Sequence, residues 1–268
     1  MNPRRSMVDR RRSFMTSSRG DVRVPVKDAT GRSGWRYSGR VPRLILWDVD
    51  HTLIENAGVS KEIYSTAFAI LTGQDAQHAA RTDGRTDRQI MAGMIAEHGA
   101  SPYDWPQIMN ALERAGAAHR DVLAARGTVL LGVVELVTAL AERPDVVQTV
   151  VTGNVRANAQ VKLGALGLAK LFDLDVGGYG SDHVERYRLV ESARQRASVK
   201  YGPEFGEAGC AVVIGDTPRD VEAARLGGAG ILAVASGLHS ADELRSAGAR
   251  RVIADLGDTA EILRYLLD

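Results

Sequence analysis

The chain has 268 residues, of which 44% are hydrophobic and 25% charged, so it can bury one sizeable core, or a core and a small companion domain. This composition excludes a chain that is disordered throughout. The single cysteine, Cys210, excludes an internal disulfide framework, and no cluster of cysteine and histidine offers the four ligands of a structural zinc site. We therefore expect a cytoplasmic protein. Because no apolar run approaches the roughly 18 residues needed to span a bilayer, we expect no association with a membrane.

Charge is distributed unevenly along the chain. Residues 1–40 contain ten Arg, one Lys and three Asp, a net charge of +8, whereas the remaining residues carry a net charge of −7. An acidic globular part is not expected to bind nucleic acid, since a phosphate backbone is held by basic surfaces. Residues 1–40 are rich in Arg, Ser and Gly and lack apolar periodicity, so the sequence predicts a disordered basic extension there.

From Pro42 onward, short apolar runs alternate with longer amphipathic stretches. This alternation predicts an α/β fold in which crossover helices join the strands of a parallel sheet. Three runs end in a polar residue, at Asp48, Thr152 and Asp216, and open α/β sheets bind ligands at the carboxyl ends of their strands. The expected strands are 44–47, 147–151, 210–214 and 230–235, with weaker candidates at 172–176 and 251–254.

A long segment without a clear strand, residues 57–126, separates the first two expected strands. Apolar residues recur in it at helical spacing, as at Ile63, Ala67 and Ile70, so we expect a small helical bundle. Because the segment follows a strand that ends in Asp48, we expect this bundle to form a cap over the ligand-binding edge. The predicted organisation is a helical cap, 57–126, inserted into an α/β core made of residues 41–56 and 127–268.

Two pairs of acidic residues follow apolar strands. Asp48 and Asp50 lie in the loop after the first strand, and Asp216 and Asp220 follow the 210–214 run. Either pair alone is typical of a solvated turn or a helix N-terminus. Two pairs at neighbouring strand ends favour a metal site, because carboxylates that share a confined site repel each other unless a cation lies between them. An oxygen-rich site of this kind suits Mg²⁺.

A third strand end carries Thr152-Gly153-Asn154. The hydroxyl, the glycine amide and the side chain of Asn154, which is able to cap the next helix, suit the binding of a phosphate. An ordinary strand-to-helix turn uses the same residue types, so this element is a weak indication by itself.

Taken together, these motifs resemble those of the haloacid dehalogenase-like phosphohydrolases over about residues 42–268. Asp48-Val49-Asp50-His51-Thr52 is similar to the first motif of that family, Asp-X-Asp-X-Thr, and Val150-Val151-Thr152 is similar to the second. Gly215-Asp216-Thr217-Pro218-Arg219-Asp220 is similar to the fourth, Gly-Asp-X-X-X-Asp. The resemblance implies a Rossmann-like three-layer core with an inserted helical cap of the family's first type, and it is strongest to phosphoglycolate phosphatase-like members.

The resemblance also implies catalytic and substrate-binding roles for individual residues. Asp48 is the expected nucleophile. Asp50 is the expected acid that protonates the leaving alcohol and the base that then activates water. Thr152, Gly153 and Asn154 are expected to bind the phosphoryl group.

A Mg²⁺ site and a substrate contact from the cap follow from the same resemblance. The expected metal ligands are Asp48, the backbone carbonyl of Asp50, and Asp216, with Asp220 lying behind them. Arg85, in the expected cap, is a candidate contact for the substrate.

The family's third motif normally supplies a Lys at a helix start between the second and fourth motifs, and none stands in residues 180–188. We expect Arg186 to replace it as the catalytic and substrate-binding cation, because a guanidinium can bridge a phosphate and a carboxylate. Arg188 is the alternative. Lys162 and Lys170 follow the second motif too closely to be attractive candidates.

His51 is a second departure, since the family often has glycine at that position. A side chain there must tolerate the backbone conformation of a tight loop. We expect a packed or solvent-facing loop histidine rather than a substrate contact.

The resemblance predicts a magnesium-dependent phosphatase that hydrolyses a small soluble phosphomonoester through an aspartyl-phosphate intermediate. The expected partner is a small phosphorylated metabolite, because a closing cap excludes polymers. Two alternatives stay open: a phosphomutase of the same family, and a catalytically weakened phosphate-binding or interaction module. A dehalogenase is disfavoured, since it has no need of a second acid such as Asp50.

Overall fold

The structure is a computed structural model that describes residues 22–27, 33–38, 42–207 and 209–267. Its largest element is a six-stranded sheet in which all neighbouring strands are parallel. In spatial order the strands are β10 (Val252–Ile253), β9 (Gly230–Val234), β8 (Ala211–Gly215), β3 (Arg43–Trp47), β6 (Val146–Thr152) and β7 (Gly178–Tyr179). The predicted α/β fold with a parallel sheet is therefore confirmed, and β3 lies between β6 and β8.

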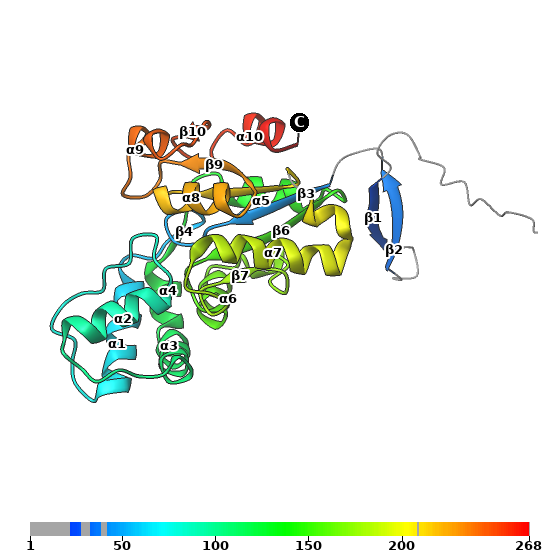
Figure 1. Cartoon of the computed structure of the whole chain (residues 1–268). Helices are drawn as coiled ribbons and strands as arrows, with labels where there is room; N and C mark the ends of the chain where they lie inside the picture. The colour runs from blue at the N-terminus through cyan, green and yellow to red at the C-terminus, as the bar shows by residue number, and fades with distance from the viewer. Residues whose placement is uncertain (1–21, 28–32, 39–41, 208, 268) are drawn as a thin grey trace, which may run out of the picture.

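Helices cover both faces of the sheet and give a three-layer core (Figure 1). Side chains of a strand alternate between its two faces, so Ile45 and Trp47 of β3 pack into one layer, and Leu44 and Leu46 into the other. All four side chains are fully buried, which explains why β3 reads as an uninterrupted apolar run. One layer contains α5 (Val133–Ala141), α6 (Arg156–Ala165) and α10 (Thr259–Leu267), and the other contains α7 (Arg186–Tyr201), α8 (Pro218–Leu226) and α9 (Ala241–Ser246).

One of the weaker strand predictions, at residues 172–176, is wrong. This segment follows a short 3-10 helix, η1 (Ala169–Leu171), and contains a turn, and the edge strand β7 begins only at Gly178. The reason is the side chain of Asp173, whose carboxylate accepts the backbone N–H of Asp175 at 3.1 Å. Such a local bond favours a turn over an extended chain.

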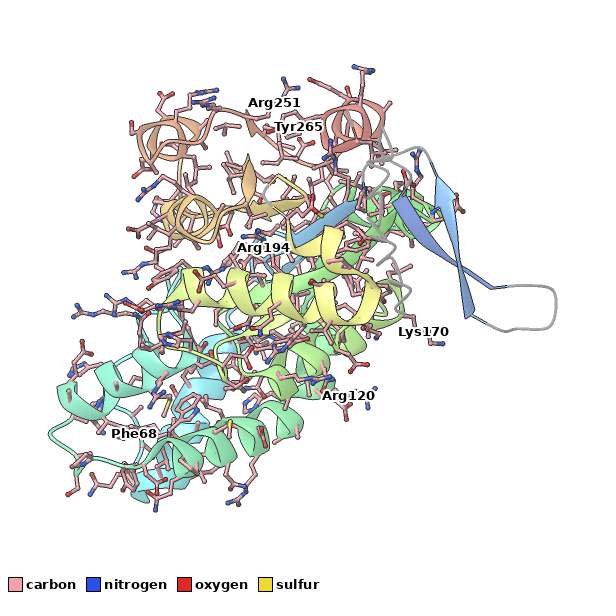
Figure 2. The ribbon with its side chains drawn as sticks, turned by 45° about the vertical axis from the view of Figure 1, so that its right-hand side comes forward. Phe68, Arg120, Lys170, Arg194, Arg251 and Tyr265 are labelled. Atoms are coloured by element: carbon pink, nitrogen blue, oxygen red, sulfur yellow. The ribbon has the colours of Figure 1, made fainter. Side chains whose placement is uncertain are left out.

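Four helices lie between β4 (Ile54–Glu55) and β5 (Thr128–Val129), two short strands that pair antiparallel. The helices are α1 (Val59–Thr72), α2 (Asp87–Glu97), α3 (Trp105–Ala118) and α4 (Arg120–Arg126). They fall within the segment 57–126 for which the sequence predicts a bundle, and they share a core of their own that includes Phe68, Met91 and Leu112. Figure 1 shows them grouped at one end of the molecule, and Figure 2 labels Phe68 among them.

Two helices that border this group and the sheet begin with a capping box. At the start of α2, Thr86 and Gln89 exchange side-chain and backbone hydrogen bonds, and Thr217 and Asp220 do the same at the start of α8. These bonds satisfy backbone N–H groups that a helix leaves without partners, and they fix where each helix begins.

Only part of the predicted basic extension, residues 1–40, lies within the described residues. There, β1 (Val22–Lys27) and β2 (Ser33–Ser38) pair as antiparallel strands rather than as irregular chain. The disorder expected for the rest of residues 1–40 lies outside the described residues. Across the described ranges, no helix is both long enough and apolar enough to pass through a membrane.

The packing of α5 against the sheet makes a testable prediction about stability. Leu136 is fully buried in the core beside β3, so Leu136→Ala should lower the free energy of unfolding by about 2–5 kcal/mol through lost burial and a cavity. The matched control is Leu131→Ala, because the Leu131 side chain is 69% exposed and its loss should change stability by less than about 0.5 kcal/mol. Urea denaturation of both variants measures the difference, and equal losses would contradict the assigned core.

Candidate active site

A cavity of about 70 Å³ lies at the carboxyl ends of β3, β6 and β8. Asp48, Thr152 and Asp216 follow or end these three strands and all line the cavity, because the strands are parallel neighbours whose carboxyl ends meet at one edge. The helical insertion supplies the facing wall, with Ser60, Tyr64, Thr82, Gly84, Arg85 and Ile90. The polar strand ends singled out in the sequence therefore meet at one site.

Three buried carboxylates form the most acidic part of this site. Within the described residues, Asp48, Asp216 and Asp220 each offer a carboxylate oxygen, and these atoms lie within 4.8 Å of one another. Burial raises the pKa of Asp48 to about 7 against the opposing charge of Arg186. Burial and the charges of Asp48 and Asp220 raise the pKa of Asp216 to about 9. The cluster holds more negative charge than its surroundings compensate.

This donor set suits a divalent cation such as Mg²⁺, which prefers carboxylate oxygens. The backbone of Gly237 lies close to the cluster, since a Cβ atom there would be only 1.9 Å from Asp216 Oδ2. The other oxygen, Asp216 Oδ1, accepts a hydrogen bond from the Thr52 hydroxyl at 3.1 Å. Asp216 is thus held in place on both sides while it lines the cavity.

Asp220 has less freedom than the other two acids. Its Oδ2 accepts hydrogen bonds from the backbone N–H of Thr217 at 3.0 Å and from the Thr217 hydroxyl at 2.7 Å. Its Oδ1 accepts from Arg186 Nε at 2.8 Å. Both oxygens are therefore engaged, which agrees with the place expected for Asp220 behind the predicted metal ligands.

Arg186, at the first turn of α7, joins the acidic cluster to the insertion. Its Nη2 donates to Asp48 Oδ1 at 2.6 Å, its Nε donates to Asp220, and its Nη1 donates to the carbonyl oxygen of Gly84 at 3.4 Å. The side chain is 9% exposed, and the two carboxylates raise its pKa further above the usual range despite burial. Arg188 points elsewhere: its side chain is 49% exposed and pairs with Glu191 at 2.8 Å. Of the two arginines considered from the sequence, only Arg186 contacts Asp48.

Asp50 lies beside Asp48 in the same loop and is surrounded by donors. Its Oδ1 accepts from Asn56 Nδ2 at 2.8 Å and from the Ser60 hydroxyl at 3.3 Å, and its Oδ2 accepts from Asn154 Nδ2 at 2.9 Å. Burial acts to raise the pKa of Asp50, but the Lys162 ammonium and these amides outweigh it and hold the pKa at about 2. Asp50 is therefore ionised, whereas burial and repulsion raise the pKa values of Asp48 and Asp216.

The loop after β6 brings backbone and side-chain donors to the same cavity. Asn154 donates from its N–H and from Nδ2 to the Thr152 hydroxyl oxygen, at 3.3 Å and 2.7 Å. Gly153 lies against the insertion, where a Cβ atom would be 2.2 Å from the carbonyl oxygen of Arg85. Gly180 lies on the other side, where a Cβ atom would be 1.9 Å from the carbonyl oxygen of Gly153. Three backbone segments are thus stacked in direct contact.

Arg85 and His51 complete the lining of the cavity. Arg85 is half-buried, and nothing in the described part of the chain pairs with its guanidinium. His51 has a φ of 62°, in the left-handed region where glycine is favoured, and its ring contacts Glu55 at 2.8 Å. The ring is packed against its own loop, yet it also faces the cavity.

A model of one known family, described as haloacid dehalogenase-like hydrolase, matches residues 45–225. The chain belongs to this family. The family resemblance read from the motifs is therefore confirmed, and with it the assignment of the protein as an enzyme of the hydrolase class.

Individual relatives of this haloacid dehalogenase-like hydrolase agree with the assignment. "Probable phosphatase IndB" from Dickeya dadantii (strain 3937) is 25% identical over 228 residues, which is 84% of this chain and 94% of that protein. The fold is similar to that of a hydrolase from Pseudomonas syringae, with a TM-score of 0.60 and 19% identity, over 85% of this chain and all of that one. It is also similar to a predicted phosphoglycolate phosphatase from Haemophilus somnus 129pt, with a TM-score of 0.56 and 15% identity, over 82% and 97% of the two chains.

Sequence reasoning missed one charged residue of this hydrolase's site, Lys162, which was set aside as lying too close behind the second motif. Its closeness in sequence to Thr152 does not keep Lys162 away from the site, because α6 runs back from the loop after β6 and brings Lys162 next to Asp50. Its Nζ lies 2.6 Å from Asp50 Oδ2, and its side chain is 2% exposed. The signal available in the sequence is its helical spacing with Ala159 and Leu163, which are buried on the same helix. Lys170, by contrast, is exposed.

The insertion is joined to the loop after β6 through Asp87, at the start of α2. Its carboxylate accepts from the Tyr64 hydroxyl at 2.6 Å and from the backbone N–H of Val155 at 2.7 Å. Its own N–H donates to the carbonyl oxygen of Gly153 at 2.8 Å. Burial raises the pKa of Asp87 to about 6, although these hydrogen bonds oppose the shift. These hydrogen bonds thus connect the insertion to the loop after β6, which is the candidate loop for binding phosphate.

The raised pKa of Asp87 predicts how its contribution to stability depends on pH. Between about pH 4 and pH 6 the folded protein keeps a proton on Asp87 that the unfolded chain has lost, so this contribution falls as the pH rises through that window. The free energy of unfolding of the wild type, minus that of Asp87→Asn, should fall by up to about 3 kcal/mol from pH 4 to pH 6 and stay level above.

Urea denaturation at several pH values measures this difference. Asp75→Asn is the control, since Asp75 is an exposed residue of the same insertion, and its difference from wild type should not vary over the window. A difference for Asp87→Asn that is constant or rises between pH 4 and pH 6 would show that Asp87 is not held in this way.

Proposed function

We propose that this protein is a Mg²⁺-dependent phosphatase that hydrolyses a small phosphomonoester through an aspartyl phosphate on Asp48. The observation that carries the proposal is the meeting of Asp48, Asp216 and Arg186 at one cavity, from three segments that are far apart in sequence. A nucleophilic carboxylate, an acidic cluster for a cation and a fixed guanidinium are the groups that phosphoryl transfer requires. Membership of the haloacid dehalogenase-like hydrolases supports the same conclusion.

Asp48 is suited to the role of nucleophile. Its Oδ1 accepts from Arg186, which fixes the carboxylate and leaves Oδ2 for attack on phosphorus. In the first step Asp48 attacks phosphorus, the bond between phosphorus and the leaving oxygen breaks, and that oxygen takes a proton that the ionised Asp50 carboxylate has first taken up from solvent. In the second step water attacks the phosphorus, Asp50 takes a proton from this water, and the bond to Asp48 breaks to release inorganic phosphate.

Asp48 and Asp216, together with the backbone carbonyl of Asp50, are proposed to hold Mg²⁺, with Asp220 behind them. The bound cation would neutralise charge on the phosphoryl oxygens and on the nucleophile. The raised pKa values of Asp48 and Asp216 support this assignment, because they indicate uncompensated negative charge. Thr152, Gly153 and Asn154 are proposed to hold the phosphoryl oxygens together with Arg186.

The substrate is proposed to be a small phosphorylated metabolite. The cavity has a volume of about 70 Å³, and the insertion forms one of its walls, so the space beyond a phosphoryl group is limited. Arg85 is the candidate contact for the part of the substrate beyond the phosphate, since it lines the cavity from the insertion side. Residues 57–126 would then act as the cap that closes over the bound molecule.

A phosphomutase is the second candidate function. A wall supplied by the insertion favours it, because shielding from water would preserve an aspartyl phosphate for transfer to a second hydroxyl. Incubation with a sugar phosphate separates the two, since a phosphomutase yields an isomer and a phosphatase yields inorganic phosphate. The third possibility, a phosphate-binding or interaction module with lost catalysis, is weakened by the contact between Arg186 and Asp48, which supplies the cation missing from the third motif.

Replacement of the nucleophile tests the proposal directly. Asp48→Asn should lower Mg²⁺-dependent hydrolysis of p-nitrophenyl phosphate by roughly 10⁴-fold or more, because an amide forms no aspartyl phosphate. Its melting temperature should equal or exceed that of the wild type, since one of several mutually repelling buried acids is removed. Asp75→Asn is the matched control with full activity expected, and turnover retained in Asp48→Asn would exclude Asp48 as nucleophile.

The cation site makes a separate prediction that needs no substrate. Mg²⁺ should raise the melting temperature of the wild type, because a ligand of the folded state alone stabilises it. Asp216→Asn should lose most of that rise, whereas Asp242→Asn, at a residue whose side chain is 92% exposed, should keep it. Equal shifts in all three proteins would argue against a cation at Asp216.

A further inference from the structure

A buried lysine with three hydrogen bonds lies directly beneath the proposed site. Lys162 Nζ donates to Asp50 Oδ1 at 2.8 Å, to Asp50 Oδ2 at 2.6 Å and to Asn154 Oδ1 at 2.8 Å. An ammonium has three donors, so all of them are used. Both partners line the cavity, and the lysine itself is almost inaccessible.

We propose that Lys162 is a positioning residue that holds the Asp50 carboxylate where it takes a proton from the water that attacks the aspartyl phosphate. This inference rests on the proposed function, because it assigns Lys162 a part in the second of the two steps. It acts through Asp50 and contacts no reacting atom, so it is not itself a catalytic residue.

Burial of this lysine is costly, which argues against an incidental contact. Transferring an ammonium out of water is unfavourable unless it is paired and hydrogen-bonded. Many apolar residues would fill the same helix position, as Ala159 and Leu163 do one turn earlier and one residue later. The ammonium contacts only Asp50 and Asn154 among the described residues, so the cost of burying it is offset by the hydrogen bonds to these two residues.

The other donors to Asp50 cannot replace Lys162. Asn56 and Ser60 reach Asp50 from the loop between β4 and α1 and from α1 itself, on the insertion side of the cavity. Lys162 reaches it from α6, which packs in the core layer. Lys162 therefore holds Asp50 from a helix of the core, whereas Asn56 and Ser60 hold it from the start of the insertion.

Asn154 gives Lys162 a second, indirect contact with Asp50. Because Asn154 Oδ1 accepts from Lys162, its Nδ2 is turned toward Asp50 Oδ2. Loss of the ammonium would remove the direct contact and would also free the amide that donates to the same carboxylate. Lys162 thus orients Asp50 both directly and through Asn154.

The proposal makes a prediction specific to one step. With p-nitrophenyl phosphate, the leaving nitrophenolate needs no proton, so formation of the aspartyl phosphate depends little on Asp50, whereas its hydrolysis depends on Asp50 as base. Lys162→Met keeps the length of the side chain and removes the charge. It should retain the first-turnover burst of nitrophenol, lower the steady-state rate by roughly 10²–10⁴-fold, and accumulate phosphorylated enzyme in an intact-mass measurement.

Lys170→Met is the matched control, since Lys170 is exposed, projects outward at the edge of the molecule in Figure 2, and does not line the cavity. It should behave as wild type in both phases. A purely structural role for Lys162 would lower the burst and the steady-state rate together without accumulation of phosphoenzyme, and that result would overturn the proposal. Wild-type turnover in Lys162→Met would overturn it as well.

A double substitution keeps the test decisive if Lys162→Met leaves a buried unpaired carboxylate and folds poorly. Asp50→Asn with Lys162→Met removes both charges of the pair, which is commonly tolerated when one charge alone is not. If Lys162 acts through Asp50, the double variant should turn over no more slowly than Asp50→Asn alone. A further loss in the double variant would contradict the proposal. Turnover retained by Asp48→Asn would instead overturn the proposed function itself, so the two failures are distinguishable.

Discussion

The site is governed by one constraint, which is that several carboxylates are buried together at one edge of a parallel sheet. Each acid is compensated differently. Asp48 is held by Arg186, and Asp50 is held by Lys162. Asp216 has no ion pair within the described residues, and its pKa is raised further than that of Asp48. The uncompensated charge is therefore concentrated where a divalent cation is proposed to bind.

This distribution also separates the chemical tasks of the two acids in the first loop. Asp48 and Asp50 are two residues apart, yet burial raises the pKa of one to about 7, and a neighbouring ammonium holds that of the other at about 2. Environment, rather than residue type, therefore keeps Asp50 ionised beside an ammonium and places Asp48 in a cluster of mutually repelling acids. Much of that difference comes from Lys162 of α6, a helix that follows a different strand from the one that carries Asp48 and Asp50.

The sequence reveals those features that depend on short patterns. A buried strand that ends in a polar residue is readable because apolar runs and strand ends are local, which is why Asp48, Thr152 and Asp216 were found. Arg186 was predicted from the family resemblance, which implies a cation at a helix start between the second and fourth motifs. The insertion was readable from the helical spacing of its apolar residues and from its length.

Features that depend on packing between distant segments were not readable in the same way. Lys162 was set aside because its burial depends on how α6 lies beneath the first loop, and a lysine in an amphipathic helix is usually solvated. The strand expected at 172–176 does not form, because the side chain of Asp173 accepts a hydrogen bond from the backbone N–H of Asp175 and so favours a turn. In both cases a tertiary or side-chain contact outweighed a local propensity.

The stacked glycines beside the cavity fix how closely the insertion approaches the core. Gly153 lies against the carbonyl oxygen of Arg85, and Gly180 lies against the carbonyl oxygen of Gly153, with no side chain between these segments. A methyl group at position 153 would overlap the Arg85 backbone, so it would push the segment that carries Arg85 away from the loop after β6. The spacing of two parts of the chain that are far apart in sequence therefore depends on a residue that has no side chain.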